Sequence, residues 1–113
     1  MKLSEIIKTS GFNVFYAPDN TEEINISSVA VTELLSDLLM NTCEHLLLIT
    51  SLTTEQAVRS AGITDVKAII ITNGKTAGKG MKIIAGDLGI PLIGTEMSNY
   101  ETALVVGRLI KDI

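Results

Sequence analysis

A strand-and-helix pattern that occurs three times constrains the fold of this chain more than any other feature. Its short apolar runs cover 46–50, 67–72 and 91–95, and the threonines that end them lie 22 and 23 residues apart. Each run is followed by a segment in which apolar residues recur at helical spacing. Strand, helix and strand at this spacing require a right-handed crossover, so the pattern predicts a parallel sheet with helices on its faces.

The helices of these units have predictable ends. The first two are expected over 54–61 with Gly62 as a left-handed stop, and over 77–88 with Gly89 in the same role. Thr54 is the expected cap of the first. In the third, Ser98 and Glu101 have the spacing of a capping box, in which each side chain satisfies a backbone donor of the first turn.

The preceding segment predicts further elements. They are a short helix ending at Gly11, a strand over 12–16, a turn over 17–23, a strand over 24–31 and an amphipathic helix over 32–42 capped by Thr32. The sequence therefore predicts an α/β protein, a three-layer α/β/α single domain of residues 1–113. It is built around a mainly parallel sheet of about five strands, with about five helices.

Composition excludes several classes of function. A net charge of −4 disfavours nonspecific binding to nucleic acid or to an anionic membrane, and no apolar run is long enough to span a bilayer. We expect a cytoplasmic protein. The single cysteine, Cys43, excludes an internal disulfide. Cys43 and His45 have no second ligand pair, so we expect no metal site, but a buried thiol and a surface or strand-edge histidine.

An apolar content of 46% with only 19% charged residues favours a homodimer in which a second copy covers apolar surface. One candidate interface is the apolar stripe of the helix expected over 32–42. The stripe consists of Leu34, Leu35, Leu38, Leu39 and Met40. The alternative is that these side chains pack on the sheet.

The letters Gly74-Lys75-Thr76 resemble the end of a nucleotide-binding P-loop. A P-loop needs a glycine five positions earlier, where this chain has Ile69 in an expected buried strand, so we predict no P-loop. A smaller anion site remains open, because Lys75, Lys79 and Lys82 are spaced to share one helical face near a helix start. The alternative is that these lysines only solvate that face.

Ligands of open parallel sheets bind beyond the carboxyl ends of the strands. The residues expected there form the candidate ligand site: Thr50, Ser51, Thr72, Asn73, Gly74, Lys75, Thr95 and Ser98. These residues suit a phosphate or nucleotide. They include no histidine or paired carboxylate for acid–base chemistry, so we expect no catalytic residues, no enzyme and no cofactor.

Several stretches together resemble the DRTGG domain over roughly residues 24 to 112. They are ELLSDLLMN (33–41), LLLIT (46–50), AIIITNG (68–74), LGIPLIGT (88–95) and SNYETA (98–103). That module accompanies CBS domains in some pyrophosphatases, occurs in some phosphate acetyltransferases, and is similar to the amino-terminal domain of HPr kinase. The expected Asp-Arg is replaced by residues 51–54, Ser-Leu-Thr-Thr, and Thr-Gly-Gly by Thr72-Asn73-Gly74.

The resemblance implies a regulatory or dimer-forming domain with the chemistry elsewhere. Our leading hypothesis is a stand-alone, non-catalytic, homodimeric domain that regulates or binds a protein partner. The alternative hypothesis is a sensor or weak enzyme that binds a nucleotide or phosphorylated small molecule at the carboxyl ends of the strands.

Overall fold

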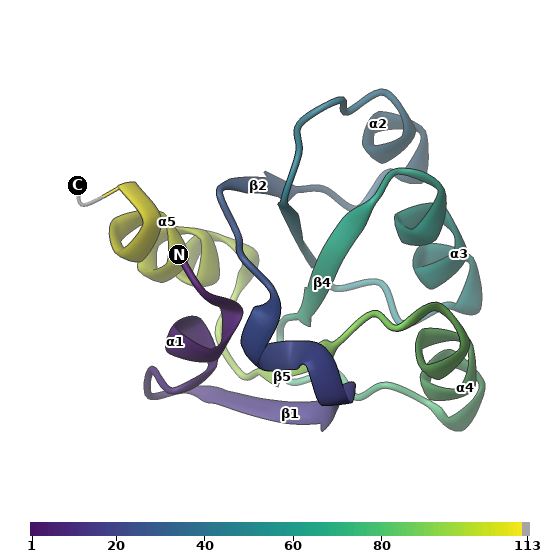
Figure 1. The fold of residues 1–113 in the computed structure, drawn as a ribbon, viewed down its shortest axis with the longest axis horizontal. Coiled ribbons are helices and arrows are strands. Elements are labelled where there is room, and N and C mark those ends of the chain that lie inside the picture. Colours follow the sequence, from purple (N-terminus) through teal and green to yellow (C-terminus); the bar gives the residue numbers. More distant parts are fainter. Residues whose placement is uncertain (112–113) are drawn as a thin grey trace.

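A computed structural model describes residues 1–111, which fold into a five-stranded sheet with helices on both faces (Figure 1). The strands are β1 (Phe12–Tyr16), β2 (Ser28–Val31), β3 (Leu46–Thr50), β4 (Val66–Ile71) and β5 (Leu92–Thr95). The helices are α1 (Leu3–Ile7), α2 (Leu35–Leu39), α3 (Glu55–Ile63), α4 (Lys79–Leu88) and α5 (Asn99–Lys111), with the short 3-10 helix η1 (Asp19–Glu23). The last residues of the predicted ranges 1–113 and 24–112 lie outside the described part.

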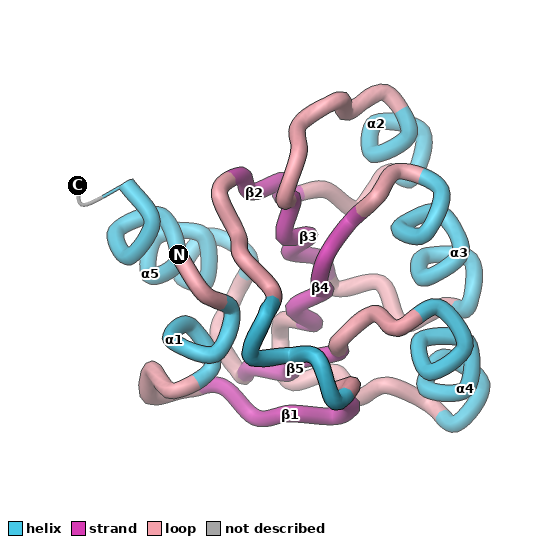
Figure 2. Tube along the Cα trace, in the orientation of Figure 1, coloured by secondary structure: helices cyan, strands magenta, loops and turns pink. Residues whose placement is uncertain are grey.

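The sheet has the order β1-β5-β4-β3-β2. Strands β2 to β5 are parallel and follow one another in space as they do in sequence, so right-handed crossovers place α2, α3 and α4 on one face (Figure 2). α5 and α1 cover the other face. The prediction of about five strands is confirmed. The sheet is mixed, however, because β1 pairs with β5 in the antiparallel direction.

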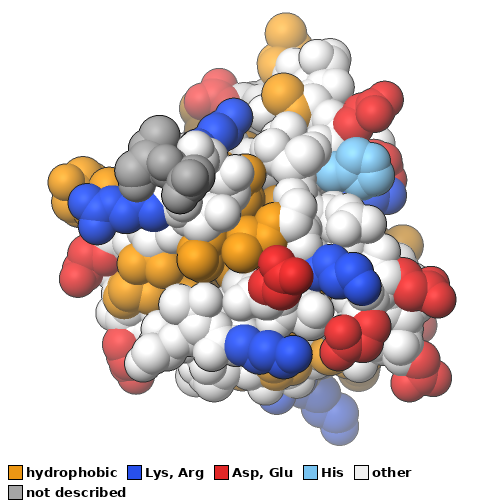
Figure 3. Space-filling model, turned by 60° about the vertical axis from the view of Figure 1, so that its left-hand side comes forward, with side chains coloured by type: hydrophobic (Ala, Val, Ile, Leu, Met, Phe, Trp, Pro, Cys, Tyr) orange, Lys and Arg blue, Asp and Glu red, His pale blue; other side chains and the backbone are white. Residues whose placement is uncertain are grey.

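The two faces of the sheet carry separate apolar cores. Side chains alternate along a strand, so in β4 Ile69 belongs to the core under α3 and α4, whereas Ile70 belongs to the core under α1 and α5. Both isoleucines are 0% exposed. Partly buried apolar side chains border the second core. Leu109 and Ile110 of this core are only partly buried, and Figure 3 shows apolar side chains in a band on that face.

The three strand–helix units are confirmed with bounds close to those predicted. The Thr54 side chain caps α3 by accepting from the Ala57 N–H at 3.2 Å. Gly89 ends α4 in the left-handed conformation, with φ of 69°. The Ser98–Glu101 capping box is present, and each side chain accepts from the other residue's N–H at 3.1 Å. Ile69, at the position where a P-loop would need its first glycine, lies in the buried part of β4, as the argument against a P-loop required.

The predicted stop at Gly62 is wrong. α3 continues to Ile63, and the left-handed residue that follows it is Asp65, with φ of 58°. A Cβ on Gly62 would lie 3.0 Å from Cδ1 of Leu88, closer than ordinary van der Waals contact. Gly62 therefore serves the close packing of α3 against α4 instead of terminating a helix.

Upstream, the predicted elements are longer than those observed. The first helix ends at Ile7, not at Gly11, and the turn over 17–23 contains η1. The strand expected over 24–31 is confined to β2. Its first residues pair with the amino terminus instead, because the Ile26 N–H donates to the Met1 carbonyl at 2.7 Å. Cys43 is exposed, so the prediction of a buried thiol is wrong, whereas His45 is exposed and directly precedes β3 as expected.

The helix expected over 32–42 is also shortened. α2 has only five residues, and Thr32 does not cap it. The Thr32 hydroxyl instead accepts from the Leu34 N–H at 3.0 Å in a local turn, which keeps these residues out of the helix. Of the predicted apolar stripe, Leu38 is buried in the core, whereas Met40 is 82% exposed.

Candidate functional site

Glu33 is the centre of a hydrogen-bond network at the carboxyl ends of the parallel strands. Its carboxylate accepts from the Ser51 N–H at 2.8 Å and from the Thr50 hydroxyl at 2.5 Å. The Ser51 hydroxyl donates to the same carboxylate, as does the Asn99 side-chain amide, at 3.0 Å. One side chain thereby joins the segment after β2, the end of β3 and the start of α5.

The pKa of Glu33 reflects these contacts. Burial raises the pKa of the carboxyl, but the hydrogen bonds that it accepts, above all that from the Ser51 side chain, outweigh burial and lower the pKa below its ordinary value. The carboxylate is therefore ionised at neutral pH, and it is held in place by donors from elements that are distant in sequence.

The network extends to the end of β4. The Thr72 hydroxyl donates to the Asn99 side-chain oxygen, and the Asn73 side-chain amide donates to Thr72 at 3.3 Å. The structure thus brings four of the predicted site residues, Thr50, Ser51, Thr72 and Asn73, into one network, and it does so through Glu33 and Asn99. Sequence reasoning identified neither of these two residues as part of the site.

The remaining predicted residues serve turns and caps. Gly74 has φ of 69°, and its N–H donates to the Thr95 carbonyl at 2.9 Å. The N–H of Asn73 donates to Met97 and that of Lys75 to Thr72. These amides already donate to carbonyls. An anion at this turn could therefore contact side chains, but it would find no cradle of free backbone N–H groups. Ser98, the last predicted residue, caps α5.

A hollow of about 70 Å³ lies beside this turn. Its lining includes Lys75 and Thr95 from the predicted set, together with Glu96, whose carboxylate stands close to Gly74. A hollow of this size accommodates a few water molecules, not a nucleotide. The acidic neighbour also disfavours a second negative charge at this position.

The three lysines do not form the shared helical face that was predicted. α4 begins at Lys79, so Lys75 lies in the loop before it. Lys82 is directed toward β1, with its Nζ 5.9 Å from the centre of the Phe15 ring. The predicted face fails because Lys75 precedes the helix, which begins only after its cap, Gly78.

Glu33 could have been found from the sequence. Residues at the ligand edge follow parallel strands, and Glu33 lies two residues beyond β2. The same rule that selects the ends of β3, β4 and β5 therefore also selects Glu33 when it is applied to β2. Asn99 carries no such signal. Its contact with Glu33 joins residues 66 positions apart and depends on the way α5 returns across the sheet.

Two further features, a metal-binding cluster and a membrane-spanning helix, are absent from the described part of the chain. Residues 1–111 contain no group of three or more His, Cys, Asp or Glu side chains arranged to hold a metal ion. None of the helices in the same residues combines the length and the apolar character needed to cross a membrane.

Comparisons with known proteins bear on the fold. No family model matches the sequence, and no curated protein matches it. A solved structure does match, with a TM-score of 0.60 and 19% identity: the CBS and DRTGG domains of the regulatory region of Clostridium perfringens pyrophosphatase, complexed with the activator diadenosine tetraphosphate. The chain has a DRTGG-like fold.

The match covers 69% of this chain and 34% of that structure, so this chain spans about a third of the matched protein's length. At this level of identity the likeness concerns the fold. It supports the resemblance that the sequence motifs indicated, and it identifies a regulatory region, not a catalytic one, as a structural neighbour.

Proposed function

We propose that this chain is a non-catalytic regulatory or partner-binding domain, that residues 1–113 form a single DRTGG-like domain, and that it acts in the cytoplasm as a homodimer. The observation that carries the proposal is the closed network around Glu33. In this network several hydroxyl and amide groups donate to the single carboxylate of Glu33. Such an arrangement suits a rigid structural joint and not a reacting group.

The dimer proposal rests on apolar side chains at one edge of the sheet. β2 is the last strand in the sheet order, and its outer edge pairs with no other strand of the described residues. Val31, the last residue of β2, is 45% exposed, and Leu34 and Met40, which flank α2, are 57% and 82% exposed. A two-fold axis here would bring two such edges together and cover these side chains, as symmetric dimers commonly do.

Sedimentation at micromolar concentration tests the dimer. We expect the wild-type chain to sediment as a dimer and the double variant Leu34→Asp/Met40→Asp as a monomer with an unchanged circular dichroism spectrum. Ile63→Asp is the matched control, because Ile63 is 76% exposed but lies on α3. A wild-type monomer, or a dimer that survives the double variant, would contradict this interface.

A second candidate function is favoured by the ligand of the structural neighbour, which is a dinucleotide activator. We propose as its site the eight strand-end residues Thr50, Ser51, Thr72, Asn73, Gly74, Lys75, Thr95 and Ser98. The ligand would lie on the surface there, because the adjacent hollow of about 70 Å³ is too small to enclose a nucleotide. A thermal-shift panel of nucleotides and phosphorylated metabolites distinguishes the two functions, because a ligand at 100 times its Kd stabilises by about 2.7 kcal/mol. The absence of a shift, or a shift undiminished in Lys75→Ala, counts against this site.

A further inference from the structure

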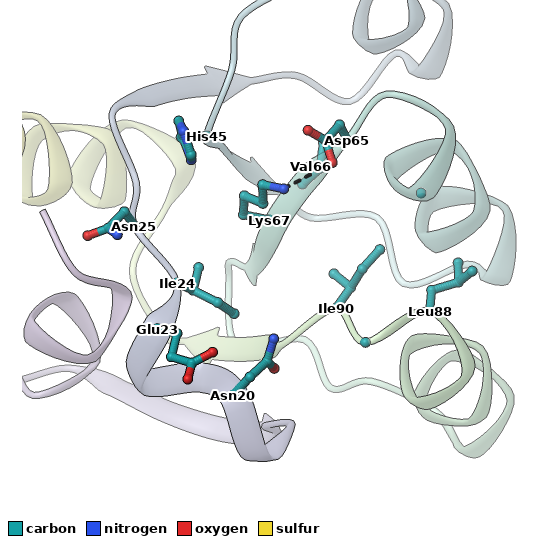
Figure 4. Close-up of a pocket in the computed structure, with 12 residues that line it drawn as sticks. Asn20, Glu23, Ile24, Asn25, His45, Asp65, Val66, Lys67, Leu88 and Ile90 are labelled. Carbon is teal, nitrogen blue, oxygen red and sulfur yellow. Dashed lines mark hydrogen bonds and ion pairs between the residues drawn. The ribbon is translucent and has the colours of Figure 1, made fainter.

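A cavity of about 410 Å³ lies at the amino-terminal ends of the strands, at the end of the sheet opposite the Glu33 network. It is bounded by η1, by the residues just before β3 and β5, and by the start of β4 (Figure 4). Its volume lies within the range of about 300–1,000 Å³ typical of small-molecule sites. None of the candidate ligand residues lines it, so it is a separate site.

The charged groups of the cavity are arranged on two sides. Lys67 and Asp65 form an ion pair with Nζ and Oδ1 3.0 Å apart, and Glu23 stands on η1 at the other side in Figure 4. A lysine ammonium has three N–H donors, so Lys67 keeps two for a ligand. Glu23 makes no ion pair within residues 1–111. One side can therefore bind an anionic group and the other a cationic group.

Two residues of the lining hold unfavourable backbone conformations. His45 has φ of 53° and Asp65 has φ of 58°, and a glycine would adopt either more easily. The conformation at Asp65 places next to the cavity a carboxylate that orients Lys67.

The rest of the lining combines polar side chains, those of Asn20, Asn25 and His45, with the apolar side chains of Ile24, Val66, Leu88 and Ile90. Ile24 and Ile90 stand across from one another in Figure 4, and Ile90 is buried. The charged lining residues, Glu23, Asp65 and Lys67, carry a net charge of −1 with His45 neutral. A nucleotide would meet no surplus of positive charge for its phosphates.

We propose that this cavity binds a small aliphatic zwitterion of the amino-acid or dipeptide class. The carboxylate of the ligand accepts from Lys67, its ammonium group donates to Glu23, and its aliphatic body packs on Ile24 and Ile90. The ligand carries one charge of each sign, as the two sides of the cavity do, and this match selects against ligands that carry only one of the two charges.

NMR titration of the ¹⁵N-labelled chain tests the proposal with L-leucine and glycyl-L-leucine as probes. We expect saturable shifts of the Val66, Lys67 and Ile90 amides with at least one probe. N-acetyl-leucine lacks the cation and leucinamide lacks the anion, so both are expected to bind roughly tenfold or more weakly. Equal binding of either derivative would overturn the zwitterion assignment. Absence of saturable shifts at these amides with both probes would overturn the site.

Matched substitutions locate the two charges. Lys67→Gln and Glu23→Gln are each expected to weaken binding roughly tenfold. The controls are Lys79→Gln, on a different part of the surface, and Glu22→Gln, which is adjacent to Glu23 on η1 but does not line the cavity. Binding that the first pair leaves unchanged, or that the controls weaken equally, would refute the assignment. So would AMP shifting these amides more strongly than either probe.

Discussion

Glu33 connects elements that are distant in the sequence through the hydrogen bonds of a single carboxylate. Its carboxylate accepts hydrogen bonds from Ser51, Thr50 and Asn99, and these bonds lower its pKa despite the opposing effect of burial. Folding therefore favours the ionised form. The associated stabilisation is complete above the ordinary pKa of 4.5 and is lost as the pH falls through the lower pKa of the folded state.

We predict that Glu33→Gln lowers the free energy of unfolding at pH 7 by about 1 kcal/mol, because a neutral amide is a weaker hydrogen-bond acceptor than a carboxylate. The effect is no larger because Glu33 is exposed to solvent. The difference from wild type should shrink at pH 3, which lies below the ordinary pKa of 4.5, because the stabilisation by the charge decreases as the pH falls below that value. Urea titrations at the two pH values measure both quantities. Glu22→Gln should change stability little at either pH, and a Glu33→Gln effect that does not vary with pH would contradict the role given to the charge.

At the scale of elements, the sequence predicted the strand–helix units well because their signals are local. Buried strands, caps and the left-handed Gly89 are each determined within a few residues. Two failures occurred where a distant contact decided the outcome. Gly62 was read as a helix stop because its closeness to Leu88, on another helix, is not visible in the sequence. The Glu33–Asn99 contact has the same origin.

Substitutions at two glycines, one in a turn and one inside a helix, test the role assigned to the turn. Gly74 has φ of 69°, and a Cβ there would collide with the Glu96 carboxylate, so Gly74→Ala should destabilise by about 1–2 kcal/mol. Gly86 lies inside α4, and a Cβ there would meet nothing within 4 Å. Gly86→Ala should therefore stabilise by about 0.5–1 kcal/mol.

Thermal or urea unfolding of the two variants measures these opposite effects. The comparison controls for the loss of glycine flexibility in the unfolded chain, which both substitutions share. If Gly74→Ala were neutral or stabilising, the Thr72–Lys75 turn would not require its left-handed residue, and its assignment as a fixed connection between β4 and α4 would be wrong.

At the scale of the whole molecule, the two ends of the sheet differ in chemistry. At the carboxyl ends, the Glu33 network connects the ends of β2, β3 and β4 with α5, and its polar groups form hydrogen bonds with one another. At the amino ends, the loops leave a cavity whose charged walls keep donors and acceptors available. The network and the cavity lie at opposite ends of the same sheet. Both can exist together only if the two apolar cores of that sheet fold as a unit.

Adjacent residues of β4 provide that test. Ile69 and Ile70 are both 0% exposed but belong to the cores on opposite faces. Ile69→Val and Ile70→Val each remove one methylene group, so each should cost about 0.5–1.5 kcal/mol. If residues 1–113 are one cooperative domain, each variant should show a single urea transition with the wild-type slope, measured alike by circular dichroism and tyrosine fluorescence. A second transition, or a reduced slope in Ile70→Val alone, would mean that the layer of α1 and α5 unfolds separately.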